Sequence, residues 1–88
     1  MEGKDISTVE IRDKIKTAIA NISDVYPKDI TDDASFTEDL GLDSLILLEI
    51  SVDIEIQFGL EVHEEDLAQI HTLQDAVMFV EQSLIGQA

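Results

Sequence analysis

The sequence has no cysteine or tryptophan, a single proline and four glycines, and these shortages exclude several kinds of chemistry. Without cysteine the chain has no disulfide, no thiolate nucleophile and no cysteine metal site. The glycines are scattered, so no glycine-rich phosphate-binding loop is present. The longest aliphatic run, LILL, is too short to cross a bilayer, and the N-terminal stretch MEGKDISTVE lacks the apolar core of a signal peptide. We therefore expect a soluble, cytoplasmic protein with no membrane span.

Basic residues are also scarce, and the chain is strongly acidic. It has 5 Lys and Arg against 20 Asp and Glu, which gives a formal net charge of −15. Such a chain repels nucleic acid phosphates and anionic lipid but attracts basic protein surfaces. Its 88 residues are expected to form one domain, 1–88, which buries only about 60% of its unfolded surface and leaves little room for a deep active site. We expect protein partners with basic patches, and no nucleic acid.

The N-terminal part of the sequence predicts a helix followed by a long loop. Ser7 and Glu10 have the S-x-x-E spacing of a capping box, and one apolar stripe follows at helical spacing: Ile11, Ile15, Ala18, Ile19 and Ile22. From residue 23 to residue 43 this period is lost, and the segment contains the single proline and many turn-forming residues. We expect three apolar side chains to hold this loop to the core: Ile30, Phe36 and Leu40.

The C-terminal part of the sequence predicts one short helix and one long helix. The short helix is expected at about Glu64 to Gln69. Thr72 and Asp75 then have the spacing of a helix N-terminus, and the final helix is expected to end near Gly86. The buried face of this last helix should contain five apolar residues: Leu73, Ala76, Val77, Val80 and Leu84.

The segment between the long loop and the short helix is ambiguous. Residues 50–58, ISVDIEIQF, alternate apolar and polar side chains and are rich in β-branched residues, which is the pattern of a half-buried strand. However, the apolar run starts earlier, at Leu45, and on a helical wheel it separates into two stripes that end before Gly59. One stripe contains Leu47, Ile50, Ile54 and Phe58, and the other contains Leu45, Leu48, Val52 and Ile56.

Residues that carry metal or catalytic chemistry elsewhere form no known constellation in this sequence. The loop DITDDASFTED lacks the glycine and the spacing of an EF-hand calcium site. His63 and His71 do not have the spacing of a zinc motif, and we expect both at exposed polar positions. Ser44 has neither a G-x-S-x-G elbow nor a partner base. We therefore predict no metal site, no catalytic residue and no enzymatic activity.

Ser44 lies in the stretch GLDSL, where a helix is expected to begin. Serine is a good helix cap, and that role alone explains its presence. A hydroxyl in the first turn of a helix is also a suitable place for a phosphodiester made by another protein, because free backbone amides and the helix dipole favour a phosphate there. The residues by themselves leave both explanations open.

The stretch DLGLDSLILLEI resembles a known family. It is similar to the D-x-G-x-D-S-L motif of the acyl carrier proteins of fatty acid and polyketide synthesis, and Glu49 matches the glutamate that follows the serine. IEIQFGLEV and EEDLAQIHTLQDAVMFV resemble later parts of the same family, so the likeness covers nearly the whole chain. The resemblance implies that Ser44, flanked by Asp43 and Leu45, carries 4′-phosphopantetheine, which a phosphopantetheinyl transferase attaches from coenzyme A.

The resemblance also implies the fold, an all-α, small four-helix bundle with three main helices, a short helix three and a long loop between helices one and two. The ambiguous segment then becomes helix two, which is the main partner surface in this family. For this surface we expect Asp43, Leu45, Leu48, Glu49, Val52, Glu55 and Ile56. An acyl pocket is expected between helices two and three, lined by Ile54, Phe58, Val62 and Leu67.

The function implied by the resemblance is that of a monomeric carrier, which delivers acyl thioesters to acyl-transferring, ketosynthase-type or adenylating enzymes. Three positions depart from the family pattern: Ile46 and Ile56 replace frequent acids, and His63 replaces a frequent proline. We interpret the more apolar helix two as an adaptation to a polyketide or other specialised pathway. The alternatives are an aminoacyl or peptidyl carrier of nonribosomal peptide synthesis and an unmodified acidic helical adaptor. The ends at Met1 and Ala88 favour a discrete carrier over an excised domain.

Overall fold

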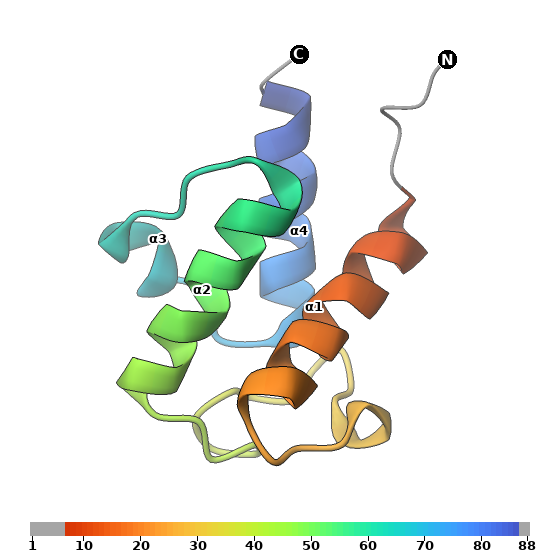
Figure 1. Ribbon diagram of the computed structural model, residues 1–88, viewed down its shortest axis with the longest axis vertical. Coiled ribbons are helices and arrows are strands. Elements are labelled where there is room, and N and C mark those ends of the chain that lie inside the picture. Colours follow the sequence, from red (N-terminus) through yellow and green to blue (C-terminus); the bar gives the residue numbers. More distant parts are fainter. Residues whose placement is uncertain (1–6, 87–88) are drawn as a thin grey trace.

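Three long helices and one short helix make up the described part of the chain, and Figure 1 shows their arrangement in the computed structural model. The structure describes residues 7–86. Its helices are α1 (Thr8–Ile22), α2 (Ser44–Phe58), α3 (Glu64–Leu67) and α4 (Leu73–Gly86), with a 3₁₀ turn, η1 (Pro27–Asp29), after α1. α1 packs against both α2 and α4. The predicted all-α bundle with a long first loop is therefore confirmed. None of the helices in this described range is long and apolar enough to cross a membrane.

α2 settles the ambiguity between strand and helix in favour of the helix. Ile50, Ile54 and Phe58 are buried at helical spacing, whereas Asp53, Glu55 and Gln57 are exposed or only partly buried. Gly59 ends the helix in the left-handed conformation, with φ at 66°. Residues 50–58 satisfy both the strand and the helix period, and in the helix the longer apolar run from Leu45 separates into one stripe that faces the bundle and one that faces solvent.

The core lies where α1, α2 and α4 meet. It contains the predicted stripe residues of α1 and α4, except that Ile22 and Leu84 are only partly buried. Leu47, which was expected to face the core, is also only partly buried. Leu42 and Leu60, at either end of α2, are buried although no periodicity indicated it. These two side chains anchor the chain just before and just after α2.

The long loop is held to the bundle at its middle, as the sequence predicted. Ile30 and Phe36 are buried and Leu40 is partly buried. The Phe36 N–H donates to His71 O at 2.8 Å, just ahead of α4, which ties two distant segments together. On the other side, Arg12 Nε of α1 donates to Asp32 Oδ1 at 2.8 Å. The loop is therefore an ordered part of the bundle, and it delivers the chain to the start of α2 in a defined place.

The helices differ from the predictions mainly at α3. Thr72 Oγ1 accepts the Asp75 N–H at 3.1 Å, and the Asp75 carboxylate accepts the Thr72 N–H at 3.2 Å, so the predicted cap of α4 is confirmed. α3 ends at Leu67, not at Gln69 as predicted. The N–H groups of Gln69 and Ile70 donate to carbonyls three residues earlier, which winds this end more tightly than an α-helix.

Candidate functional site

The approach to Ser44 is shaped by the three residues that precede it. Gly41 has φ at 68°, a left-handed conformation that favours glycine. Leu42 is buried, and its N–H donates to Phe36 O at 2.8 Å. Asp43 follows as the N-cap of α2. This segment fixes the start of α2 at the end of the bundle opposite the start of α1 and the end of α4 (Figure 1).

Asp43, not Ser44, caps α2. Its Oδ1 accepts the Ile46 N–H at 3.0 Å, and its carbonyl oxygen accepts the Leu47 N–H at 3.0 Å. Ser44 is the first residue of the helix and is exposed, and none of the hydrogen bonds within residues 7–86 uses its Oγ. The explanation of Ser44 as a helix cap is therefore wrong. Its hydroxyl is accessible and is free of any capping role.

The first turn of α2 also suits a phosphate on Ser44. In the described part of the chain, the backbone N–H groups of Ser44 and Leu45 have no protein acceptor. These groups lie at the positive end of the helix dipole, which favours an attached anion. A phosphodiester on Ser44 Oγ fits this environment.

The outer face of α2 presents a row of exposed apolar side chains. The exposed fractions are 65% for Leu45, 49% for Leu48, 46% for Val52 and 76% for Ile56. We call these four residues the α2 outer stripe. Glu49 is exposed in the same part of the helix. Isolated exposed apolar residues are common in proteins, whereas these four form a row along one helix face that begins beside Ser44.

Glu55, which was predicted as part of the partner surface, also makes a contact within the fold. Its Oε2 accepts the N–H of Val62 at 2.8 Å, and the side chain is partly buried. The carboxylate therefore joins the last turn of α2 to the segment that leads into α3. Glu55 thus makes a contact within the fold and is partly exposed, and its role in the partner surface stays a prediction.

A small cavity lies inside the bundle, on the side of α2 opposite the outer stripe. Its volume is about 40 Å³, and side chains from α1, α2, α3 and α4 line it. Of the predicted pocket residues, Ile54, Val62 and Leu67 line the cavity. Phe58 does not line it and is buried in the core one turn beyond Ile54; its place in an acyl pocket stays a prediction. Sequence reasoning missed the other lining residues, which are Ile15, Phe36, Leu47, Ile50, Ser51, Ile70, Ala76, Phe79 and Val80.

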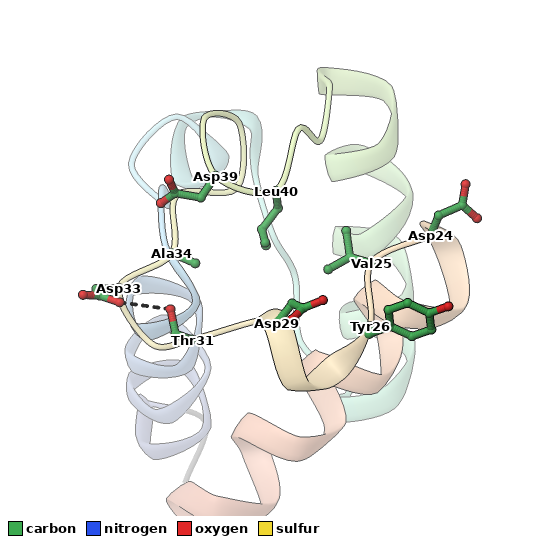
Figure 2. Close-up of a pocket in the computed structure, with 9 residues that line it drawn as sticks. All are labelled: Asp24, Val25, Tyr26, Asp29, Thr31, Asp33, Ala34, Asp39 and Leu40. Carbon is green, nitrogen blue, oxygen red and sulfur yellow. Dashed lines mark hydrogen bonds between the residues drawn. The ribbon is translucent and has the colours of Figure 1, made fainter.

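A second, open hollow lies along the long loop (Figure 2). Val25 and Leu40 point toward its middle, whereas the carboxylates of Asp24, Asp33 and Asp39 point outward, away from that middle. Thr31 Oγ1 donates to Asp33 Oδ1 at 3.0 Å. Among residues 7–86, no three His, Asp or Glu side chains gather closely enough to hold a metal ion. The loop acids therefore act as dispersed surface charge.

Comparisons with known proteins agree with this site. The family model described as phosphopantetheine attachment site matches residues 13–80. The chain is 38% identical over 73 residues to an acyl carrier protein of Solidesulfovibrio magneticus, a match that covers 83% of this chain and 94% of that protein. A solved structure of acyl carrier protein from Enterococcus faecalis, described for its high thermal stability, superposes with a TM-score of 0.75. That pair is 28% identical, and the match covers 89% of this chain and 99% of the other.

The chain belongs to the acyl carrier protein family. Its prosthetic group is 4′-phosphopantetheine, and it is a carrier on which enzymes act, not an enzyme itself. The peptidyl carrier and the unmodified adaptor, the two alternatives from the sequence, gain no support from these comparisons.

Proposed function

We propose that Ser44 is the attachment residue and that this domain, residues 1–88, presents acyl thioesters to partner enzymes. The observation that carries the proposal is the exposed Ser44 hydroxyl, which is left free because Asp43 caps the helix. In the attachment step, a transferase joins Ser44 Oγ to the phosphopantetheinyl phosphorus of coenzyme A, the pyrophosphate P–O bond breaks, and adenosine 3′,5′-bisphosphate leaves. The thiol at the end of the arm then holds the acyl group as a thioester.

Partner enzymes are proposed to dock on the α2 outer stripe. The net charge of −15 draws basic surfaces toward the carrier, and Asp43 and Glu49 place acid next to the stripe. The four apolar side chains then provide contact area that orients the bound enzyme. The expected partners are a phosphopantetheinyl transferase and acyl-transferring, ketosynthase-type or adenylating enzymes with basic patches. A monomeric state and a cytoplasmic location remain predictions.

The pathway is proposed to be polyketide or other specialised synthesis. This proposal rests on Ile56, whose side chain is 76% exposed where the family often has an acid. Ile46 also stands where the family often has an acid, but it is partly buried against the core and contributes less to the surface. The apolar character of the surface therefore depends mainly on one residue. A partner that fits Ile56 needs an apolar contact where a partner of an acidic carrier needs a basic one.

The attachment proposal is tested by intact mass. The purified protein is incubated with coenzyme A and a broad-specificity phosphopantetheinyl transferase, with Ser44→Ala as the matched control. We expect one added phosphopantetheine on the wild type and none on the variant. No mass change on a folded wild type, or an equal gain on Ser44→Ala, would refute the assignment.

The pathway proposal is tested by exchange. Acylated wild type and Ile56→Glu are offered to fatty acid synthase enzymes beside those enzymes' own carrier. We expect the wild type to be used poorly and Ile56→Glu to be used better. Equal use of the wild type and the native carrier would remove the proposal of a specialised pathway without affecting Ser44.

A further inference from the structure

Among residues 7–86, Ser51 is the only polar side chain that lines the 40 Å³ cavity. The other lining side chains are aliphatic or aromatic. Ser51 is 5% exposed, and it is the one buried polar residue in the described range. A hydroxyl in an otherwise apolar wall is costly to bury unless its hydrogen-bonding capacity is used.

Only the donor part of that capacity is used, and it is used inside the helix. Ser51 Oγ donates its proton to Leu48 O at 2.6 Å. A hydroxyl has one donor and two acceptor lone pairs, so the donor is spent and the acceptors remain. None of the donors within residues 7–86 reaches this oxygen. The cavity wall therefore contains an unpartnered hydrogen-bond acceptor.

Water is a poor partner for this acceptor. A buried water is stable when it has two to four polar contacts, and this cavity offers one. A group that suits the site donates one hydrogen bond and is otherwise surrounded by carbon. An alcohol on a hydrocarbon chain has this chemistry. A ketone does not, because it is only an acceptor and would require the Ser51 proton to leave Leu48 O.

The position and size of the cavity restrict the chain that can reach Ser51. Ser44, Leu47 and Ser51 follow one another at i, i+3 and i+7, which places them along one side of α2. Ser51 is two turns, about 10 Å, from Ser44 along the helix axis. The cavity, at about 40 Å³, is small. Only a small group enters without the helices moving apart.

We propose that this cavity selects short hydroxyacyl chains over alkyl chains of the same shape, and that Ser51 is the residue that determines this specificity. The inference rests on the proposed function, because an acyl chain reaches the cavity only when it is attached through Ser44. The Ser51 acceptor receives the hydroxyl proton of the cargo, and Leu47, Ile54 and Phe79 surround its carbon atoms. The alkyl chain leaves the acceptor unpartnered.

The test compares two thioesters that differ by one group. The carrier is loaded with 3-hydroxybutyryl or 3-methylbutyryl phosphopantetheine from the corresponding coenzyme A thioester, so a hydroxyl replaces a methyl at the same carbon. Cleavage by hydroxylamine is followed by intact mass, and each rate is divided by that of the same thioester on free pantetheine. A chain held in the cavity is cleaved more slowly.

On the wild type we expect the hydroxyacyl thioester to be protected about three- to ten-fold more than the methyl analogue, the range of one net hydrogen bond. Ser51→Ala should bring this ratio to one. Ser83→Ala, a serine of α4 outside the cavity, is the control and should leave the ratio unchanged.

A ratio near one on the wild type would overturn the proposal, as would a ratio that survives Ser51→Ala. Both results are obtained on a loaded carrier and leave the assignment of Ser44 intact. A wild type that accepts neither thioester would instead refute the proposed function, and this inference with it.

Discussion

The Asp43 side chain accepts a hydrogen bond from the Ile46 N–H at 3.0 Å, and this contact caps α2 one residue before Ser44. Asp43 therefore caps the helix, and the adjacent Ser44 is left for modification. If Ser44 capped the helix, a phosphodiester on its oxygen would disturb the helix end. With Asp43 as the cap, the Ser44 hydroxyl can be esterified while the first turn of α2 keeps its hydrogen bonds.

This division predicts opposite results for two neighbouring alanine substitutions. Asp43→Ala removes the cap and should lower the free energy of unfolding by about 1 kcal/mol. In a domain of this size, that corresponds to roughly 4–8 °C in melting temperature. Ser44→Ala removes no hydrogen bond of the fold and should change the melting temperature by less than about 2 °C. Thermal unfolding by circular dichroism measures both.

Asp43→Asn is the matched control for the cap, because an asparagine side chain also accepts the Ile46 N–H but carries no charge. It should retain most of the stability. If Ser44→Ala destabilised the fold as much as Asp43→Ala, the assignment of the cap to Asp43 alone would be wrong.

The elements that the sequence alone predicted are those whose signals come from contacts within one helical turn. The ends of α1 and α4 were predictable because Ser7 and Thr72 act through hydrogen bonds within one turn. α2 was not predictable from its own pattern, because residues 50–58 fit two periods. The family resemblance decided between them, and the buried Ile50 and Ile54 agree with that decision.

The parts of the site that escaped prediction depend on contacts between distant elements. The Glu55 carboxylate meets the Val62 N–H only because the chain turns back after Gly59. Helical spacing placed Phe58 with Ile54, but the cavity ends before Phe58. Ser51 attracted no attention in the sequence because a serine in a helix is ordinary until its burial is known. Periodicity indicates which helix face a residue occupies, but not which other parts of the chain pack against that face.

The contact between Glu55 and Val62 predicts a specific loosening of the segment before α3. Glu55→Ala leaves the Val62 N–H without its acceptor and should lower the free energy of unfolding by about 1 kcal/mol. Hydrogen exchange at the Val62 amide should become faster, and amides in the middle of α1 should change only as far as global stability does. NMR-detected exchange at these amides measures the effect.

Glu55→Gln provides the control for charge, since its side-chain carbonyl still accepts the Val62 N–H. This variant should keep the Val62 amide protected. Equally fast exchange in both variants would mean that the charge of Glu55, and not its hydrogen bond, holds the segment.

The left-handed Gly59 predicts a purely conformational cost of substitution. No atom lies within 4 Å of the position that a Cβ on this residue would occupy, so an alanine meets no clash. Its φ of 66° still disfavours an L side chain, and Gly59→Ala should cost about 1 kcal/mol in urea unfolding. Gly59→Asn should cost less, because asparagine tolerates this conformation better than alanine. A neutral Gly59→Ala would show that α2 can end in another way.

The acidic surface predicts that salt stabilises the fold. The chain has a formal net charge of −15, and its Cα radius of gyration is 12.3 Å. Its carboxylates thus repel one another over distances comparable with the Debye length, which is about 10 Å at 0.1 M salt. Sodium chloride or magnesium chloride should therefore raise the melting temperature, because screening weakens a repulsion that is strongest in the compact state. Removing exposed charges with Asp13→Asn and Glu38→Gln should raise the melting temperature at low salt and reduce its slope against salt concentration. If salt left the midpoint unchanged or lowered it, the repulsion would not limit the stability of this carrier.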